Sequence, residues 1–215
     1  TTEIYTLSLH DALRSGADIF FVGQASLQSF FSIAYWTLFF FIPALTMRSL
    51  AEEIKTGTIE MILTKPVSRW QVIVGKYLAT LLLIGIALAL TLPYYISVAR
   101  IGNIDHGAVI TGYLGLLLMS SAYISIGIFA SSISNNQIVA FLLALFIGIF
   151  FHIIFSVLSE SFTGFLAEVF DYLNLSTHFE SISRGVIDTK DLLYFVSISF
   201  LGLVSAEIAL EKRTS

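Results

Sequence analysis

The sequence predicts an all-α integral membrane protein with about five transmembrane helices present. Of its 215 residues, 56% are hydrophobic and only 12% are charged, whereas soluble domains carry roughly 25% charged residues. Five apolar segments are each long enough to cross a bilayer, which takes about 20 residues in a helix. Lysine and arginine residues gather between the first two of these segments. Such clustering is typical of the cytoplasmic side of a membrane protein.

Composition also excludes several kinds of function. The chain has no cysteine, which excludes disulfides, thiolate metal sites and cysteine nucleophiles. Its net charge of -4 is small, and its basic residues follow the predicted topology rather than a stripe. We therefore expect no nucleic-acid partner.

Residues 1–17 do not read like the start of a membrane protein. They lack an initiator methionine, a signal-peptide pattern and hydrophobic continuity with the residues that follow. We interpret residues 1–17 as a non-native or disordered stretch and residues 18–215 as a single transmembrane domain.

The five predicted spans differ in composition. Pro43 and Pro93 are expected to kink the first two, which neighbouring helices make tolerable. The third is rich in Gly, Ala and Ser, and small residues let membrane helices approach closely. We favour helix packing within the chain over a subunit or pathway surface for this span. The spans are predicted at about 26–47, 72–99, 108–131, 138–158 and 192–210.

The distribution of basic residues predicts the orientation of these spans. The polar segment, defined here as residues 48–71, and Lys76 just after it hold five of the 11 Lys and Arg residues. Because basic residues close to spans mark the cytoplasmic side, the polar segment is predicted to be cytoplasmic and residues 159–191 external. The N-terminus is then outside with an odd number of spans, so we expect six spans in the intact protein.

The polar segment is predicted to begin with a short amphipathic helix. Leu50 and Ile54 fall on one face of this helix, and Gly57 breaks it. The opposite face is charged. Its charged residues are Glu52, Glu53 and Lys55.

A second short helix is predicted after the break. Thr58 can cap it, with Glu60 in its first turn, and Pro66 stops it. Ser68 followed three residues later by Gln71 is typical of a capping box that opens the next long helix. This arrangement suggests a surface offered to a cytoplasmic partner.

The external residues 159–191 contain one clear helical pattern. Apolar side chains recur at helical spacing from Phe162 to Leu173, with Glu168 and Asp171 opposite. We predict an amphipathic helix that lies in the outer interface or folds back over the spans.

Candidate catalytic or metal-binding groups are few. His152 lies in an apolar span, where an ionisable residue is a functional candidate by default, but we favour a hydrogen-bonded structural histidine over a substrate or proton site. No set of metal ligands stands out, so no metal site is predicted. The sequence lacks the zinc-protease, serine-hydrolase and phosphate-loop motifs. We therefore expect a non-catalytic chain that cannot hydrolyse nucleotides alone.

The polar segment resembles the coupling region of ABC transporter type 2 permeases. In that family, the motif Glu-x-x-x-Gly-Thr-x-Glu-x-x-Leu-x-x-Pro lies between the second and third of six spans, which correspond to the first two spans predicted here. Further stretches, such as HFESISRGVIDTKDLLYF near the C-terminus, resemble the gliding-motility-associated permease of Bacteroidetes, the GldF-like branch. The resemblance covers roughly residues 18–213. Its motif positions are Glu53, Gly57, Thr58, Glu60, Leu63 and Pro66.

The resemblance implies the permease subunit of an ATP-driven exporter, associated with gliding motility, in the bacterial inner membrane. Two permease subunits, identical or different, would form the pathway in the lipid bilayer, with ATP and Mg bound on separate ATPase subunits. Each polar segment would insert into a groove of an ATPase. Leu50, Ile54, Met61 and Ile62 would supply apolar contact, Gly57 the bend, and Glu52, Glu53, Lys55 and Glu60 the charge complementarity.

Two other classes of function remain open. A non-transporting anchor or assembly factor that recruits a cytoplasmic ATPase to a surface motility or secretion machine would need the same polar segment. A membrane-embedded enzyme is disfavoured because no catalytic constellation is found in the sequence. ATPase activity stimulated by a specific substrate would distinguish a transporter from an anchor.

Overall fold

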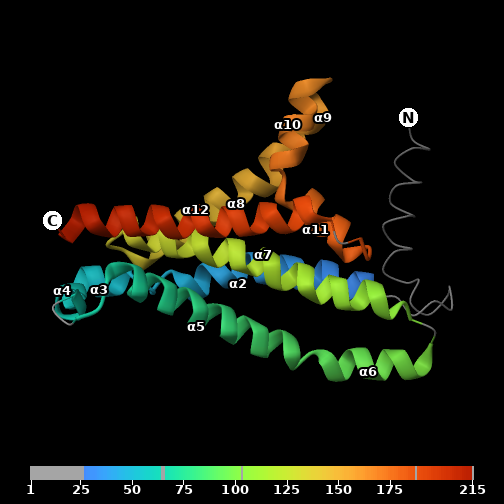
Figure 1. Ribbon diagram of the computed structural model, residues 1–215, viewed down its shortest axis with the longest axis horizontal. Helices are drawn as coiled ribbons and strands as arrows, with labels where there is room; N and C mark the ends of the chain where they lie inside the picture. Colours follow the sequence, from blue (N-terminus) through green and yellow to red (C-terminus); the bar gives the residue numbers. More distant parts are fainter. Residues whose placement is uncertain (1–26, 64–65, 103, 187, 215) are drawn as a thin grey trace.

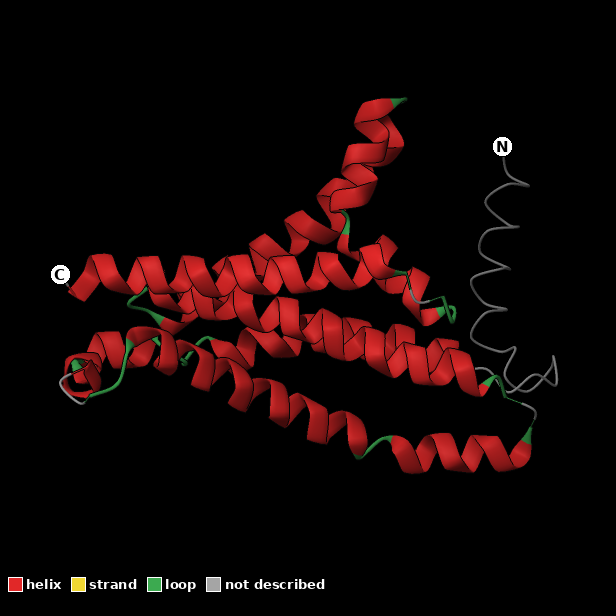
Figure 2. Cartoon of the chain, in the orientation of Figure 1, coloured by secondary structure: helices red, strands yellow, loops and turns green. Residues whose placement is uncertain are grey.

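The computed structural model describes residues 27–63, 66–102, 104–186 and 188–214, and it is a bundle of helices around one central helix. Every regular element in these ranges is helical (Figure 1, Figure 2). Five helical stretches are long and apolar enough to cross a membrane, which confirms the predicted fold class. Residues 1–17 lie outside the described residues. The helices are α2 (Gln28–Thr46), α3 (Ala51–Thr56), α4 (Thr58–Leu63), α5 (Arg69–Ala89), α6 (Leu92–Ile101), α7 (His106–Ile133), α8 (Gln137–Ile149), η1 (Phe150–Ile154), α9 (Phe155–Ser161), α10 (Phe165–Leu173), α11 (Leu175–Ser183) and α12 (Thr189–Thr214).

The centre of the bundle is α7. Its apolar stretch is 72% buried inside the chain, whereas the other four spans are 17–39% buried. Small residues allow its neighbours to approach closely: a Cβ added to Gly127 would overlap Oγ1 of Thr46 on α2. A Cβ on Gly202 of α12 would lie 2.6 Å from Oγ of Ser125 on α7. The small residues of this span therefore serve helix packing within the chain.

The second span is broken rather than kinked. α5 ends at Ala89, and α6 begins at Leu92 with Pro93 in its first turn. Proline has no N–H to continue a helical ladder, but it is tolerated in a first turn, where the N–H has no partner within the helix. At the break, the Thr91 hydroxyl donates to the carbonyl of Leu88 at 2.6 Å. The sequence predicted a kink at Pro93 but not that the helix is fully interrupted just before it.

The fourth span contains a π-helical turn. α8 runs into η1, which is followed by α9 without a loop. A π turn has one residue more than an α-helical turn, and such turns are frequent at functional sites. His152 is the middle residue of η1.

Residues 159–191 contain two helices of different character. α10 packs alongside α9 after a turn at Gly164, and the pair projects away from the bundle (Figure 1), with Phe165 78% exposed. α11 instead lies against α7 through the buried side chains of Leu175, Phe179 and Ile182. The sequence predicted the amphipathic pattern of α10 but missed α11.

A buried histidine joins α11 to α12. Nδ1 of His178 lies 2.6 Å from Oδ1 of Asp191, and its Nε2 lies 2.8 Å from the carbonyl oxygen of Tyr172. The imidazole also stacks on the ring of Tyr194 at a centroid distance of 4.0 Å. These contacts hold α11 against the bundle.

Candidate functional site

The polar segment forms the two short helices that its sequence predicts. α3 ends at Thr56 and is capped by Gly57, whose φ of 70° lies in the left-handed region that favours glycine. α4 begins at Thr58 with Glu60 in its first turn, and it ends at Leu63. The predicted break and restart of the helix are therefore confirmed.

The capping box at the start of α5 is also confirmed. Oγ of Ser68 accepts a hydrogen bond from the N–H of Gln71 at 3.2 Å. In return, Oε1 of Gln71 accepts one from the N–H of Ser68 at 3.0 Å. Two N–H groups without partners inside the helix are thereby satisfied, which fixes where α5 begins.

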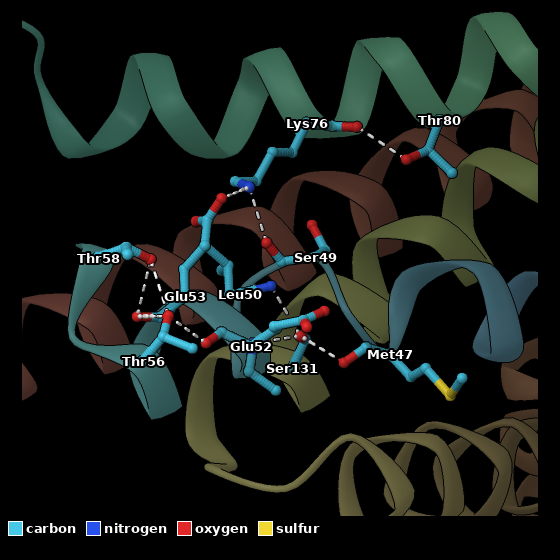
Figure 3. Close-up of polar contacts among 11 residues, drawn as sticks. Met47, Ser49, Leu50, Glu52, Glu53, Thr56, Thr58, Lys76, Thr80 and Ser131 are labelled. Carbon is cyan, nitrogen blue, oxygen red and sulfur yellow. Dashed lines mark hydrogen bonds and ion pairs between the residues drawn. The ribbon is translucent and has the colours of Figure 1, made fainter. Parts of the chain in front are cut away.

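The start of α3 is held by a serine of the central helix. Oγ of Ser131, near the end of α7, accepts hydrogen bonds from the N–H groups of Leu50 and Ala51, both at 2.9 Å (Figure 3). The same hydroxyl donates to the carbonyl of Met47 at 3.1 Å. Leu50, Ala51 and Ser131 are all fully buried. Ser131, a residue distant in sequence, thus accepts the hydrogen bonds that an N-cap side chain usually accepts.

The side of α3 is held by a lysine of α5. Nζ of Lys76 lies 2.6 Å from Oε1 of Glu53 and donates to the carbonyl of Ser49 at 2.7 Å (Figure 3). Each side chain of the ion pair is only 25% exposed. Because solvent screens such a pair poorly, it restrains α3 more strongly than an exposed pair would. We call Ser131 and Lys76 the α3 anchors.

The predicted contact residues divide into an exposed set and an internal set. Ile54 is half-buried, and Glu53 is engaged by Lys76. The side chain of Leu63 is not described. The exposed set, available to a partner, consists of Glu52, Lys55, Gly57, Thr58, Glu60 and Pro66.

One predicted role is wrong. Leu50 was expected to offer apolar contact to a partner, but its exposed fraction is 0% because it packs into the chain's own core. Met61, at 69% exposed, is an apolar side chain that α4 presents outward. The surface of the polar segment is consequently more charged than its sequence pattern suggests.

Sequence reasoning did not identify the anchors as such. Ser131 was one small residue among many in its span, and no local pattern indicates that its hydroxyl faces α3. Lys76 stood out as a basic residue near a span, which is equally typical of a side chain at the lipid interface.

His152 is hydrogen-bonded, as the structural interpretation predicts. Its Nδ1 lies 2.7 Å from the hydroxyl oxygen of Tyr35 on α2. Aromatic rings surround it, with the Trp36 centroid at 5.0 Å and the Phe39 centroid at 5.9 Å. The imidazole also lines a cavity between α2, α9 and α11. No cluster of metal-binding side chains occurs within the part of the chain that the structure describes.

The fold and the polar segment define a multi-pass α-helical membrane protein with a short helix pair between two spans. Residues 8–209 match the family described as ABC-2 family transporter protein, and the chain therefore belongs to the ABC-2 transporter family. Membership makes it a membrane component of an ABC transporter, and it implies an ABC ATPase as partner. No curated protein matches the chain.

Proposed function

We propose that this chain is the permease subunit of an ATP-driven exporter in the bacterial inner membrane, within the gliding-motility-associated branch of its family. The polar segment lies on the cytoplasmic side and docks on a separate ATPase chain. ATP and Mg bind to that chain, because no phosphate loop occurs in this one. A second permease subunit completes the pathway.

The observation that carries this proposal is the attachment of α3 to two different spans. Ser131 ties the start of α3 to α7, and Lys76 ties its side to α5. A displacement of α3 therefore cannot occur without moving α7 or α5 or breaking buried polar contacts. Contiguous contacts of this kind transmit motion between sites. Since α7 contacts α2, α5, α8, α11 and α12, its movement reaches the whole bundle.

The charges of the polar segment support a protein partner. Glu52 and Glu60 are exposed on α3 and α4, with Lys55 as the exposed base of these helices. An anionic inner leaflet attracts basic helices, so an excess of acid disfavours simple adsorption to lipid. A groove with basic residues on an ATPase would complement this surface, and rim charges of this kind set orientation and association rate.

The test is capture of the ATPase from membranes in mild detergent by the tagged full-length protein. We expect an ATPase chain to co-purify and to be lost when Glu52 and Glu60 are both changed to lysine. The matched control is Glu168→Lys, which reverses an exposed charge on α10, remote from the polar segment, and is expected to retain the ATPase. Failure to capture any ATPase with the unaltered protein, or equal capture by the double variant, would refute the docking proposal.

A further inference from the structure

A cavity of about 660 Å³ lies between α2, η1, α9 and α11, at the end of the bundle away from α3 and α4 (Figure 1). Its size falls within the roughly 300–1,000 Å³ typical of small-molecule sites. The polar segment does not contribute to it, so the proposed docking does not account for this cavity. Its lining combines an aromatic wall with a charged rim.

The aromatic wall is formed mainly by α2 and α11. The rings of Tyr35 and Phe179 lie 4.7 Å apart, and that of Trp36 lies 5.9 Å from Tyr35. All three residues line the cavity together with His152. The bond between Tyr35 and His152 holds these two side chains in place. Such a wall suits a ligand with an apolar body, and aromatic faces attract cations.

The charged rim is acidic. Glu160 of α9 and Glu180 of α11 line the cavity, and Arg184 is the basic residue beside them. The guanidinium of Arg184 donates to Glu180 at 3.0 Å, so its charge is already largely compensated. Two carboxylates and one guanidinium leave one net negative charge. The rim therefore complements an ammonium group rather than an isolated phosphate or carboxylate.

We propose that this cavity binds an amphiphile that carries one ammonium group. The ammonium group lies between the rim carboxylates, and the apolar body lies against Tyr35, Trp36 and Phe179. Serine hydroxyls of the lining, such as that of Ser156, offer acceptors for the remaining N–H groups. The ligand is either a phospholipid with an amine head group or a free hydrophobic amine, since both share this chemistry.

The charged rim leaves the cavity open to the surroundings of the protein, because Glu160, Glu180 and Arg184 are all exposed. A role for the cavity in loading a transported substrate rests on the permease function proposed above. Binding itself does not, and it is measurable without nucleotide or ATPase.

The binding experiment uses the full-length protein in an uncharged maltoside detergent with Trp70→Phe, so that Trp36 is the tryptophan reporter. The probe is bromoundecyl-trimethylammonium, whose bromine quenches tryptophan fluorescence. The matched neutral probe is bromoundecanol, which has the same chain and no charge. We expect saturable quenching by the ammonium probe and only weak, non-saturable quenching by the alcohol. Equal quenching by both probes would overturn the proposal.

Variants of the rim give effects of opposite sign. Glu160→Gln with Glu180→Gln is expected to weaken binding about tenfold, since both acidic partners of the ammonium group are lost and each exposed pairing contributes modestly. Arg184→Gln releases Glu180 and is expected to tighten binding about threefold. Glu168→Gln, an exposed acid of α10 outside this cavity, is the control and is expected to leave binding unchanged. An unchanged affinity in the double variant would refute the proposed rim contacts.

Competition identifies the source of the ligand. If phosphatidylethanolamine displaces the probe, the natural ligand is a lipid head group. If dodecylamine displaces the probe and phosphatidylethanolamine does not, the ligand is a free amine. Displacement by neither would overturn the assignment of an amine ligand. Helical circular dichroism of each variant checks that the fold is kept. If the protein binds the probe but captures no ATPase, only the proposed function is refuted. If it captures the ATPase but does not bind the probe, only this cavity assignment is refuted.

Discussion

Lys76 of α5 and Glu53 of α3 form an ion pair with a 2.6 Å Nζ–Oε1 distance, and each side chain is 25% exposed. This ion pair joins the polar segment to the span that follows it. Solvent screens the pair only partly. The same ammonium group donates to the carbonyl of Ser49. The pair therefore restrains both the helix and the turn that leads into it.

A double-mutant cycle on this pair tests its strength. We expect Lys76→Met and Glu53→Gln to show a coupling free energy of about 1 kcal/mol or more, because the pair is shielded and hydrogen-bonded. The measurement is thermal unfolding of the single and double variants in detergent. Lys190 and Asp188 are the control pair: their N–O distance is 3.2 Å, but the side chains are 58% and 44% exposed. Equal coupling in both pairs would contradict the restraint assigned to Lys76.

Replacement of Ser131 by alanine should loosen α3. The change leaves the buried N–H groups of Leu50 and Ala51 without an acceptor, at a cost of about 1–3 kcal/mol. We expect faster hydrogen exchange at these two amides and a lower unfolding temperature.

Ser132→Ala is the control for Ser131. Ser132 is also buried, but its hydroxyl donates within α7, to the carbonyl of Phe129 at 2.7 Å. Its loss leaves no N–H without a partner, so exchange at the start of α3 should stay slow. If both variants speed that exchange equally, Ser131 does not anchor α3.

Substitutions at Gly57 should disturb the bend between α3 and α4 without disturbing insertion of the protein into the membrane. An L-residue at a φ of 70° costs roughly 1–2 kcal/mol, and proline cannot adopt this angle at all. We expect Gly57→Pro to abolish ATPase-dependent function while membrane insertion stays normal, with Gly57→Asn the mildest change. Gly75→Ala, in the interior of α5 with nothing within 4 Å of the added Cβ, is the control. Normal function of Gly57→Pro would contradict a role for the bend.

The proposed orientation is testable with single cysteines, because the chain has none of its own. Cysteines at Glu168 and Lys190 should react with a membrane-impermeant maleimide added to intact cells. A cysteine at Lys55 should react only after the membrane is opened. The opposite pattern would invert the topology that we propose.

The sequence was sufficient to predict features set by local chemistry. The break at Gly57 follows from backbone freedom, and the start of α5 follows from the reciprocal bonds of Ser68 and Gln71. The five spans follow from apolar length alone. Each of these depends on residues close together in the chain, so a linear pattern is enough to reveal them.

Features that depend on contacts between distant residues were missed. Ser131 is 80 positions from Ala51, and nothing near either residue indicates their hydrogen bonds. α11 was overlooked because its buried side chains face α7 rather than forming a long apolar run. Leu50 was misjudged for a related reason: a periodic pattern predicts an apolar face but not which neighbour covers it.

The uneven burial of the spans has a consequence for how the bilayer acts on this protein. α7 meets little lipid, whereas the span of α5 and α6 is only 17% buried and is interrupted between Ala89 and Leu92. A change in acyl-chain length is accommodated by tilting or bending of the helices that touch lipid. Thicker or thinner membranes should therefore reorient α5 before α7, and the adjustment would reach α3 through Lys76 while Ser131 stays in place.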